Sequence, residues 1–267
     1  FRQQNYTNAE IQFRRIYQNT NWPVSELTYE AKMQEGRAAF ARQGFNNAQE
    51  LFTQILNAQP PYPGLVADAF FAYGDCLMMQ ASISTNAFAR YEEASTAYRT
   101  ITRNFPTNAV TPKAWGSLGN CLLQLAQQDP VFYTTEATNA YQQVLNHPLA
   151  IVQDRSQAEI GIALALKKRA ESLPSLSDRT LLLEKALYHF HRVLYGNNLH
   201  AGEVAHPFWL KKAGLESAQT AETLQNWDAA LGTYSRLREL LPQLAPDLDR
   251  RIARARAAKT GETRPAQ

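Results

Sequence analysis

The sequence has little charge and no long apolar run. Charged residues make up 19% of the 267 residues, and the net charge is +3. So weak a positive balance gives no reason to expect nucleic acid as a partner, because nucleic acid is bound mainly through its phosphates. No apolar run approaches the roughly 20 residues that a membrane-spanning helix needs. We therefore expect no direct membrane span and no nucleic-acid ligand.

Motifs that carry catalysis or bind metal are also missing from the sequence. It contains no phosphate-binding glycine-rich loop, no H-E-x-x-H, no C-x-x-C and no G-x-S-x-G. His189 and His191 stand two residues apart on an expected helix and point to different sides, so they do not form a chelating pair. The sequence therefore predicts no enzyme, no cofactor and no metal site.

Cysteine is scarce, with Cys76 and Cys121 as its only occurrences. Each follows a glycine by two residues, at equivalent positions of neighbouring helix pairs. Stacked helices of this kind lie roughly 10 Å apart, whereas a disulfide needs Cα atoms within about 7 Å. We expect two free, buried thiols.

Apolar side chains recur with helical spacing along nearly the whole chain, and small residues recur among them. A glycine marks the first helix of each expected pair, and an alanine followed by a large residue marks the second. Small side chains let paired helices approach closely, so a larger residue there should cost roughly 1–3 kcal/mol. The glycines are Gly36, Gly74, Gly119, Gly161 and Gly214, paired with Ala48, Ala94, Ala137, Ala186 and Ala230.

The clearest repeat seam lies between residues 101 and 126. Trp115, Leu118, Gly119 and Leu122 form W-x2-L-G-x2-L shortly after a helix that closes at Pro106. This pattern resembles the tetratricopeptide (TPR) repeat family. The resemblance implies an all-α fold, a TPR α-solenoid in which antiparallel helix pairs form a right-handed superhelix.

The resemblance predicts a single array over residues 1–258, of about five and a half repeats and a C-terminal cap helix. We expect the chain to begin inside a repeat, with further repeats, and any signal or membrane anchor, before it; a native N-terminal cap helix is the alternative. The predicted segments are a half repeat 1–20, repeats 24–62, 65–108, 110–149, 150–198 and 205–243, a cap helix 246–258 and a disordered tail 259–267.

Helix ends are predicted from proline and capping residues. Asp129-Pro130 is expected to end a helix, and Ser177 to cap the start of another. The last helix should bury Leu248, Ile252 and Ala255 and expose an arginine-rich face. We interpret that face as a solvated cap of the array rather than as a phosphate site.

In the TPR family the binding surface is a concave groove lined by the first helix of each pair. Phe71, Met78 and Met79 would form an adaptable apolar floor, although both methionines could instead pack under a long turn. The residues Met33, Phe71 and Asp75 do not fit a chaperone carboxylate clamp. The predicted groove residues are Arg37, Phe40, Phe71, Asp75, Met78, Met79, Lys113, Asn120, Arg155 and Lys211.

The resemblance implies a non-enzymatic scaffold that binds partner proteins or peptides in this groove. The alternative is a structural subunit of a larger assembly, held through its convex face and its ends. Residues 97–126 are similar to the outer-membrane assembly lipoproteins and the Tol–Pal coordinator proteins of bacteria. That similarity implies a periplasmic or cell-envelope location; a cytoplasmic one is the alternative.

Overall fold

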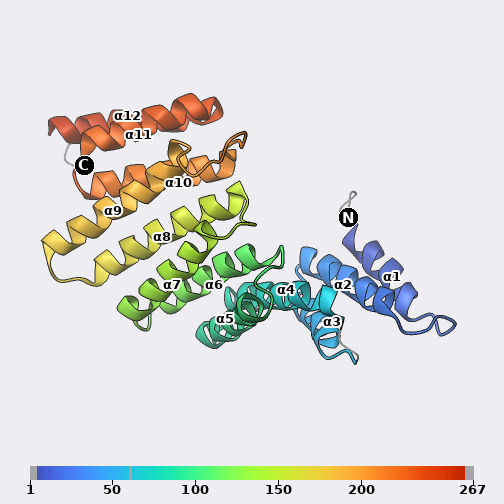
Figure 1. The fold of residues 1–267 in the computed structure, drawn as a ribbon. Coiled ribbons are helices and arrows are strands. Elements are labelled where there is room, and N and C mark those ends of the chain that lie inside the picture. Colours follow the sequence, from blue (N-terminus) through green and yellow to red (C-terminus); the bar gives the residue numbers. More distant parts are fainter. Residues whose placement is uncertain (1–4, 60–61, 262–267) are drawn as a thin grey trace. The chain divides into compact units, whose positions relative to one another are not determined.

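The computed structural model describes residues 5–59 and 62–261, and over these residues it contains helices and turns but no strand. Within each of its two compact units, consecutive helices pack against each other, as in an all-α solenoid (Figure 1). The expected all-α fold is confirmed. The chain divides into two compact units, residues 1–125 and 126–267, which are described separately below.

The first unit runs from α1 to α6, and within it each pair of consecutive helices is in contact. Helices α2 and α4 also contact each other directly, so the first helices of successive pairs share one face. The bounds are α1 (Tyr6–Tyr17), α2 (Glu26–Ala41), α3 (Phe45–Leu56), α4 (Pro63–Ala81), α5 (Ala87–Asn104) and α6 (Thr111–Leu125).

The second unit repeats this order of packing from α7 to α12. The bounds are α7 (Pro130–Leu145), α8 (Val152–Ser172), α9 (Leu176–Leu194), α10 (Pro207–Thr223), α11 (Trp227–Leu240), the short 3-10 helix η1 (Pro242–Leu244) and α12 (Ala245–Thr260).

Glycines in both units leave room for a large side chain of a neighbouring helix. A Cβ atom at Gly36 would meet the Phe52 ring, and one at Gly74 would lie 2.7 Å from Cζ of Tyr98. Phe52 and Tyr98 are fully buried. The expected alanines are buried beside them, so the small-residue pattern marks real helix contacts in α2–α3 and α4–α5.

The pairing differs at Gly161. The three atoms nearest to a Cβ atom there belong to the ring of Tyr141 on α7, the preceding helix. The closest contact was expected with the helix of Ala186. The difference arises because a helix inside a solenoid packs against both neighbouring helices. The sequence does not show which of the two fills the space beside the glycine.

Several helix ends differ from the expectation. Pro130 begins α7 instead of ending a helix, with Asp129 as the N-cap whose side chain accepts from the backbone N–H of Phe132. Ser175, not Ser177, caps α9 by accepting from the N–H of Asp178. Lys259 and Thr260 are helical rather than part of a disordered tail; residues 262–267 lie outside the described residues.

Helix α1 is held to α2 mainly by polar contacts. Its one buried residue is Glu10, whereas Phe13 is partly exposed and Ile16 is 37% exposed. Glu35 on α2 is 1% exposed and accepts from Arg14 Nη2 and from the Tyr17 hydroxyl, both at 2.6 Å. Hydrogen bonds to the buried Glu35 therefore help to attach α1 to α2.

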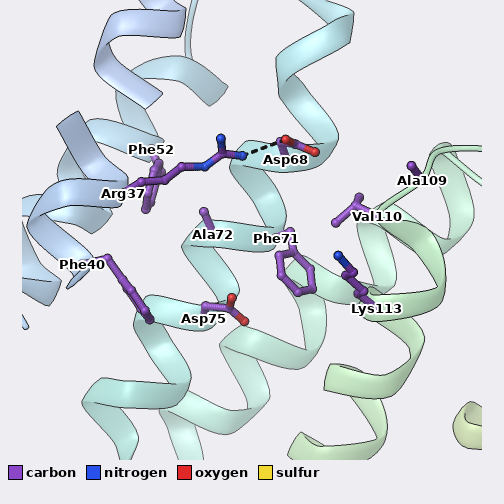
Figure 2. A pocket seen from close by; sticks show the side chains of 10 residues that line it. All are labelled: Arg37, Phe40, Phe52, Asp68, Phe71, Ala72, Asp75, Ala109, Val110 and Lys113. Atoms are coloured by element: carbon purple, nitrogen blue, oxygen red, sulfur yellow. Dashed lines mark hydrogen bonds and ion pairs between the residues drawn. The ribbon is translucent and has the colours of Figure 1, made fainter. Parts of the chain in front are cut away.

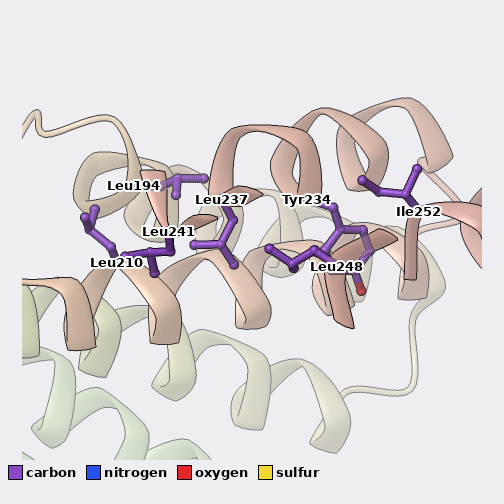
Figure 3. Close-up of a cluster of buried hydrophobic side chains, with 8 residues drawn as sticks. Leu194, Leu210, Tyr234, Leu237, Leu241, Leu248 and Ile252 are labelled. Atoms are coloured by element: carbon purple, nitrogen blue, oxygen red, sulfur yellow. The ribbon is translucent and has the colours of Figure 1, made fainter. Parts of the chain in front are cut away.

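The last helix closes the second unit as expected. Leu248, Ile252 and Ala255 are its buried residues. Leu248 and Ile252 join Tyr234 and Leu237 of α11 in one apolar cluster (Figure 3). Within the described residues, none of the helices combines the length and apolar character that a membrane crossing requires.

Replacing Gly74 by alanine should lower the free energy of unfolding by roughly 1–3 kcal/mol, because the buried Tyr98 ring has nowhere to move. Gly232 on α11 provides the matched control, since nothing lies within 4 Å of a Cβ atom there. Gly232→Ala should stabilise the chain by about 0.5–1 kcal/mol through helix propensity alone. Denaturant unfolding of both variants measures the difference, and equal effects would contradict the packing described.

Candidate functional site: a cavity on the face of α2, α4 and α6

A cavity of about 400 Å³ opens in the first unit, on the face shared by α2, α4 and α6 (Figure 2). Its walls come mostly from the first helix of each pair and from the turn that precedes α6, and Phe52 of α3 also contributes. The lining residues are Arg37, Phe40, Phe52, Asp68, Phe71, Ala72, Asp75, Ala109, Val110 and Lys113.

Aromatic rings form much of the wall, and neighbouring rings hold them in place. Phe40 packs edge-on against Phe45, with ring centroids 5.3 Å apart. Phe71 lies 5.6 Å from the buried ring of Tyr98. The cavity is therefore bounded by side chains whose orientation is fixed by packing.

Asp75 lies between Phe40 and Phe71, with its carboxylate directed into the cavity (Figure 2). The Tyr98 hydroxyl donates to Asp75 Oδ1 at 2.6 Å. Burial raises the pKa of Asp75 to about 6, and the hydrogen bond from Tyr98 opposes this shift. Among the described residues, no cation approaches closely enough to lower this pKa.

Two cations border the same cavity. Arg37 Nη2 forms an ion pair with Asp68 Oδ2 at 2.9 Å, and both side chains are well exposed. Lys113 is exposed on α6. The Phe71 ring lies between Lys113 and Asp75 in Figure 2.

A second hollow, of about 550 Å³, adjoins the first and shares Arg37 and Asp68 with it. Its lining is mostly apolar, and two of its side chains, Trp22 and Leu27, are 58% and 67% exposed. The Arg37–Asp68 ion pair thus stands between two hollows on one face. The other lining residues are Phe13, Ile16, Glu30, Ala31, Met33, Gln34 and Leu65.

The structure brings together half of the predicted groove residues, namely Arg37, Phe40, Phe71, Asp75 and Lys113. Asn120 is partly buried on α6 and does not line the cavity. Met78 contacts Cys121, whose Sγ lies 3.0 Å from Met78 Sδ, and Met79 is 42% exposed. Neither methionine forms the cavity floor, so that part of the prediction is wrong.

Cys121 and Cys76 are both free and buried, as expected. Burial is the main cause that raises the pKa of each thiol, that of Cys76 to about 12. Both thiols therefore stay protonated and unreactive near neutral pH.

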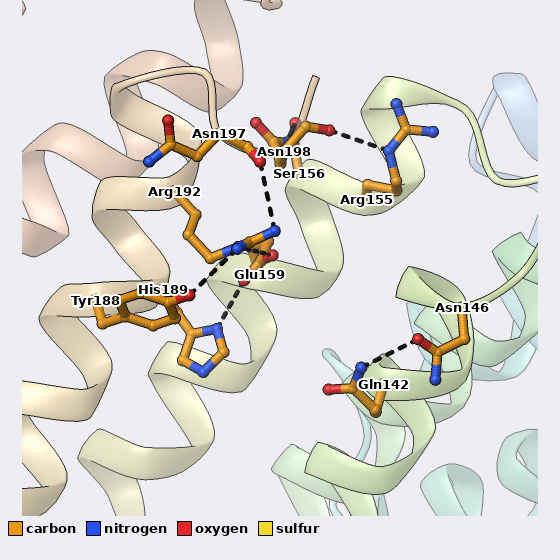
Figure 4. Close-up of polar contacts among 10 residues, drawn as sticks. All are labelled: Gln142, Asn146, Arg155, Ser156, Glu159, Tyr188, His189, Arg192, Asn197 and Asn198. Carbon is orange, nitrogen blue, oxygen red and sulfur yellow. Dashed lines mark hydrogen bonds and ion pairs between the residues drawn. The ribbon is translucent and has the colours of Figure 1, made fainter. Parts of the chain in front are cut away.

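Arg155 and Lys211 belong to the second unit. Lys211 is exposed on α10, but Arg155 is only 4% exposed. Its guanidinium donates to Asn198 O at 3.1 Å and also binds Ala150 O and Glu203. Arg155 fastens a loop to α8 (Figure 4), so its expected role as an open groove residue is wrong.

Glu159, one helical turn from Arg155, forms a similar internal network. It is 1% exposed and contacts Arg192 Nε and His189 Nδ1, each at 2.6 Å (Figure 4). These side chains link α8 to α9. His189 is thus an internal partner of a carboxylate, and across the described part of the chain no three His, Cys, Asp or Glu side chains gather as metal ligands.

Sequence reasoning missed the parts of the site that lie outside the first helices. Ala109 and Val110 come from the turn before α6, where no helical spacing applies. Trp22 lies in the segment before α2. The signal available in the sequence was the occurrence of three large apolar residues, Trp22, Val24 and Leu27, in an otherwise polar stretch.

Comparison with protein-family models and with curated proteins gave no match. Among solved structures, the chain is similar to BtubC (BKLC) from P. vanneervenii, with 14% sequence identity and a TM-score of 0.48. The match covers 98% of this chain and 92% of that chain. A similarity of this degree carries no argument about function.

Arg155→Ala should lower the free energy of unfolding by about 1–3 kcal/mol, because it leaves buried carbonyl oxygens without their donor. Lys211→Ala, an exposed lysine of the same unit, should change stability by less than about 0.5 kcal/mol. Denaturant unfolding compares the two variants. A stable Arg155→Ala variant would show that the buried network is not structural.

Asp75→Asn should remove a pH-dependent loss of stability. The folded-state pKa of Asp75 is raised, so the folded chain holds its proton more tightly than the unfolded chain does, and wild-type stability falls as pH rises from about 4 to about 6. The free energy of unfolding of Asp75→Asn, relative to that of the wild type, should therefore increase by on the order of 2 kcal/mol across that window. Unfolding curves measured at a series of pH values test this, and a constant difference would contradict it.

Proposed function

We propose that the chain is a non-enzymatic TPR scaffold that binds a segment of a partner protein along the face of α2, α4 and α6. The observation that carries this proposal is the pair of adjoining hollows on that face, which share Arg37 and Asp68. Two open hollows in a row suit an extended chain or a helix of a partner protein.

Exposed apolar side chains support the same function. Trp22 and Leu27 border the second hollow, and rings of Phe40 and Phe71 border the first. Large apolar and aromatic side chains at a surface hollow are typical anchors of protein interfaces. Because residues 97–126 resemble cell-envelope TPR proteins, we also propose that the partner is met in the bacterial cell envelope.

Selection of random peptides displayed on phage against the immobilised chain tests the binding function. Peptides that are enriched should bind the Phe71→Glu variant at least about tenfold more weakly, since an anchor residue in an interface typically contributes more than about 1.4 kcal/mol. Fluorescence anisotropy of the labelled peptides gives the dissociation constants.

Two further variants make the result specific. Ala109→Trp obstructs the same cavity from an exposed position and should also weaken binding. Phe132→Glu introduces the same change at a 55% exposed phenylalanine of α7 and should leave binding unchanged. The proposal would fail if no peptide were enriched, or if Phe71→Glu and Ala109→Trp both bound the peptides as the wild type does.

A further inference from the structure

Asp75 differs from the buried glutamates of the described residues because its side-chain hydrogen-bond partner is neutral. Glu35, Glu10 and Glu159 each contact an arginine. Asp75 receives the Tyr98 hydroxyl on Oδ1, and no described hydrogen bond or ion pair reaches Oδ2. The fold therefore leaves a desolvated negative charge at the cavity wall without a counter-charge of its own.

The surroundings of Asp75 define what could supply that counter-charge. The rings of Phe40 and Phe71 flank it (Figure 2). Aromatic faces accept both the aliphatic stem and the cationic head of lysine and arginine. Arg37 is already paired with Asp68 at 2.9 Å, so it does not neutralise Asp75.

We propose that this cavity receives a lysine or arginine side chain of the partner protein, with its stem against Phe40 and Phe71 and its charged head on Asp75. The inference rests on the proposed function and specifies the chemistry of the bound segment. A glutamate or a purely aliphatic side chain would leave the Asp75 carboxylate desolvated and unpaired, which costs binding free energy.

Binding of a basic side chain should depend on pH. The charged and titratable groups that line the cavity with Asp75 or interact with it electrostatically are Tyr98 from α5, Cys121 and Lys113 from α6, Arg37 from α2, and Asp68 and Cys76 from its own helix α4. Burial raises the pKa of Tyr98 and of Cys121, so both stay neutral near pH 6. Asp75, with its pKa raised to about 6, is the group that changes charge there.

The direction of this pH dependence follows from the charge of Asp75. Below about pH 6 Asp75 becomes protonated and loses its attraction for a cation, so binding weakens as pH falls. A bound cation lowers the pKa of Asp75, so the midpoint for the complex should lie below that of the free chain.

Mixtures of random peptides that share one fixed central residue are the probe for this inference. The fixed residue is arginine, lysine, citrulline, norleucine or glutamate, and each mixture is passed over the immobilised wild-type chain. The arginine and lysine mixtures should be retained about tenfold or more over the citrulline and norleucine mixtures, as a charge-assisted hydrogen bond predicts. The glutamate mixture should be retained least.

Asp75→Asn and Glu184→Gln form the matched pair of variants. Asp75→Asn keeps an acceptor for Tyr98 and removes only the charge, so it should lose the preference for arginine and lysine and the dependence on pH. Glu184→Gln removes an exposed carboxylate on α9 and should behave as the wild type. A basic preference that persists in Asp75→Asn would overturn the inference.

The outcomes also separate this inference from the proposed function. If the wild type retained the norleucine and arginine mixtures equally, and Phe71→Glu retained neither, the basic anchor would be rejected. The proposed binding function would stand in that case. Retention of none of the mixtures would reject both. Retention of free arginine amide as strongly as the arginine mixture would point to a small-molecule site, and would overturn the assignment of a partner protein.

Discussion

The contact between a glycine of one helix and a ring of its neighbour fixes how closely the helices of each unit approach. The contact between Gly74 and the Tyr98 ring is the clearest example. The missing side chain at Gly74 makes room for the Tyr98 ring, and the ring's hydroxyl then reaches the next residue, Asp75. The same ring supports Phe71. One packing contact therefore determines both the helix spacing and the geometry of the candidate site.

Charged side chains inside the two units differ in whether they have a charged or only a neutral partner. In the second unit, Arg155 and Glu159 are almost fully buried and have charged or carbonyl partners on the neighbouring segments, so these networks stabilise the fold. Asp75 in the first unit lies at a cavity, and only a neutral hydroxyl binds it. An uncompensated charge does not help the chain to fold, and this contrast is why we assign Asp75 to binding.

Helices, their order and the buried faces could be predicted from the sequence, because apolar periodicity and small residues act locally. Leu248, Ile252 and Ala255 are an example, since they are the buried residues of α12 as expected. The candidate site was predicted only in part. Arg155 occupies a helix position equivalent to that of exposed residues in other repeats, and its burial depends on a loop around Asn198 whose path no periodicity describes.

Met78 and Trp22 illustrate the same limit. Whether Met78 faces the cavity or the core depends on the approach of α6, which brings Cys121 against it. Trp22 borders a hollow through a segment that has no repeat pattern. Contacts of this kind are set by tertiary packing, and a repeat consensus contains no information about them.

A crystal structure of the chain with an enriched peptide is the most direct measurement of the central claim. The account predicts that the peptide lies across the hollows bordered by α2, α4 and α6, with a basic side chain at Asp75 between Phe40 and Phe71. A peptide seated on α3 and α5, or on the second unit alone, would contradict it.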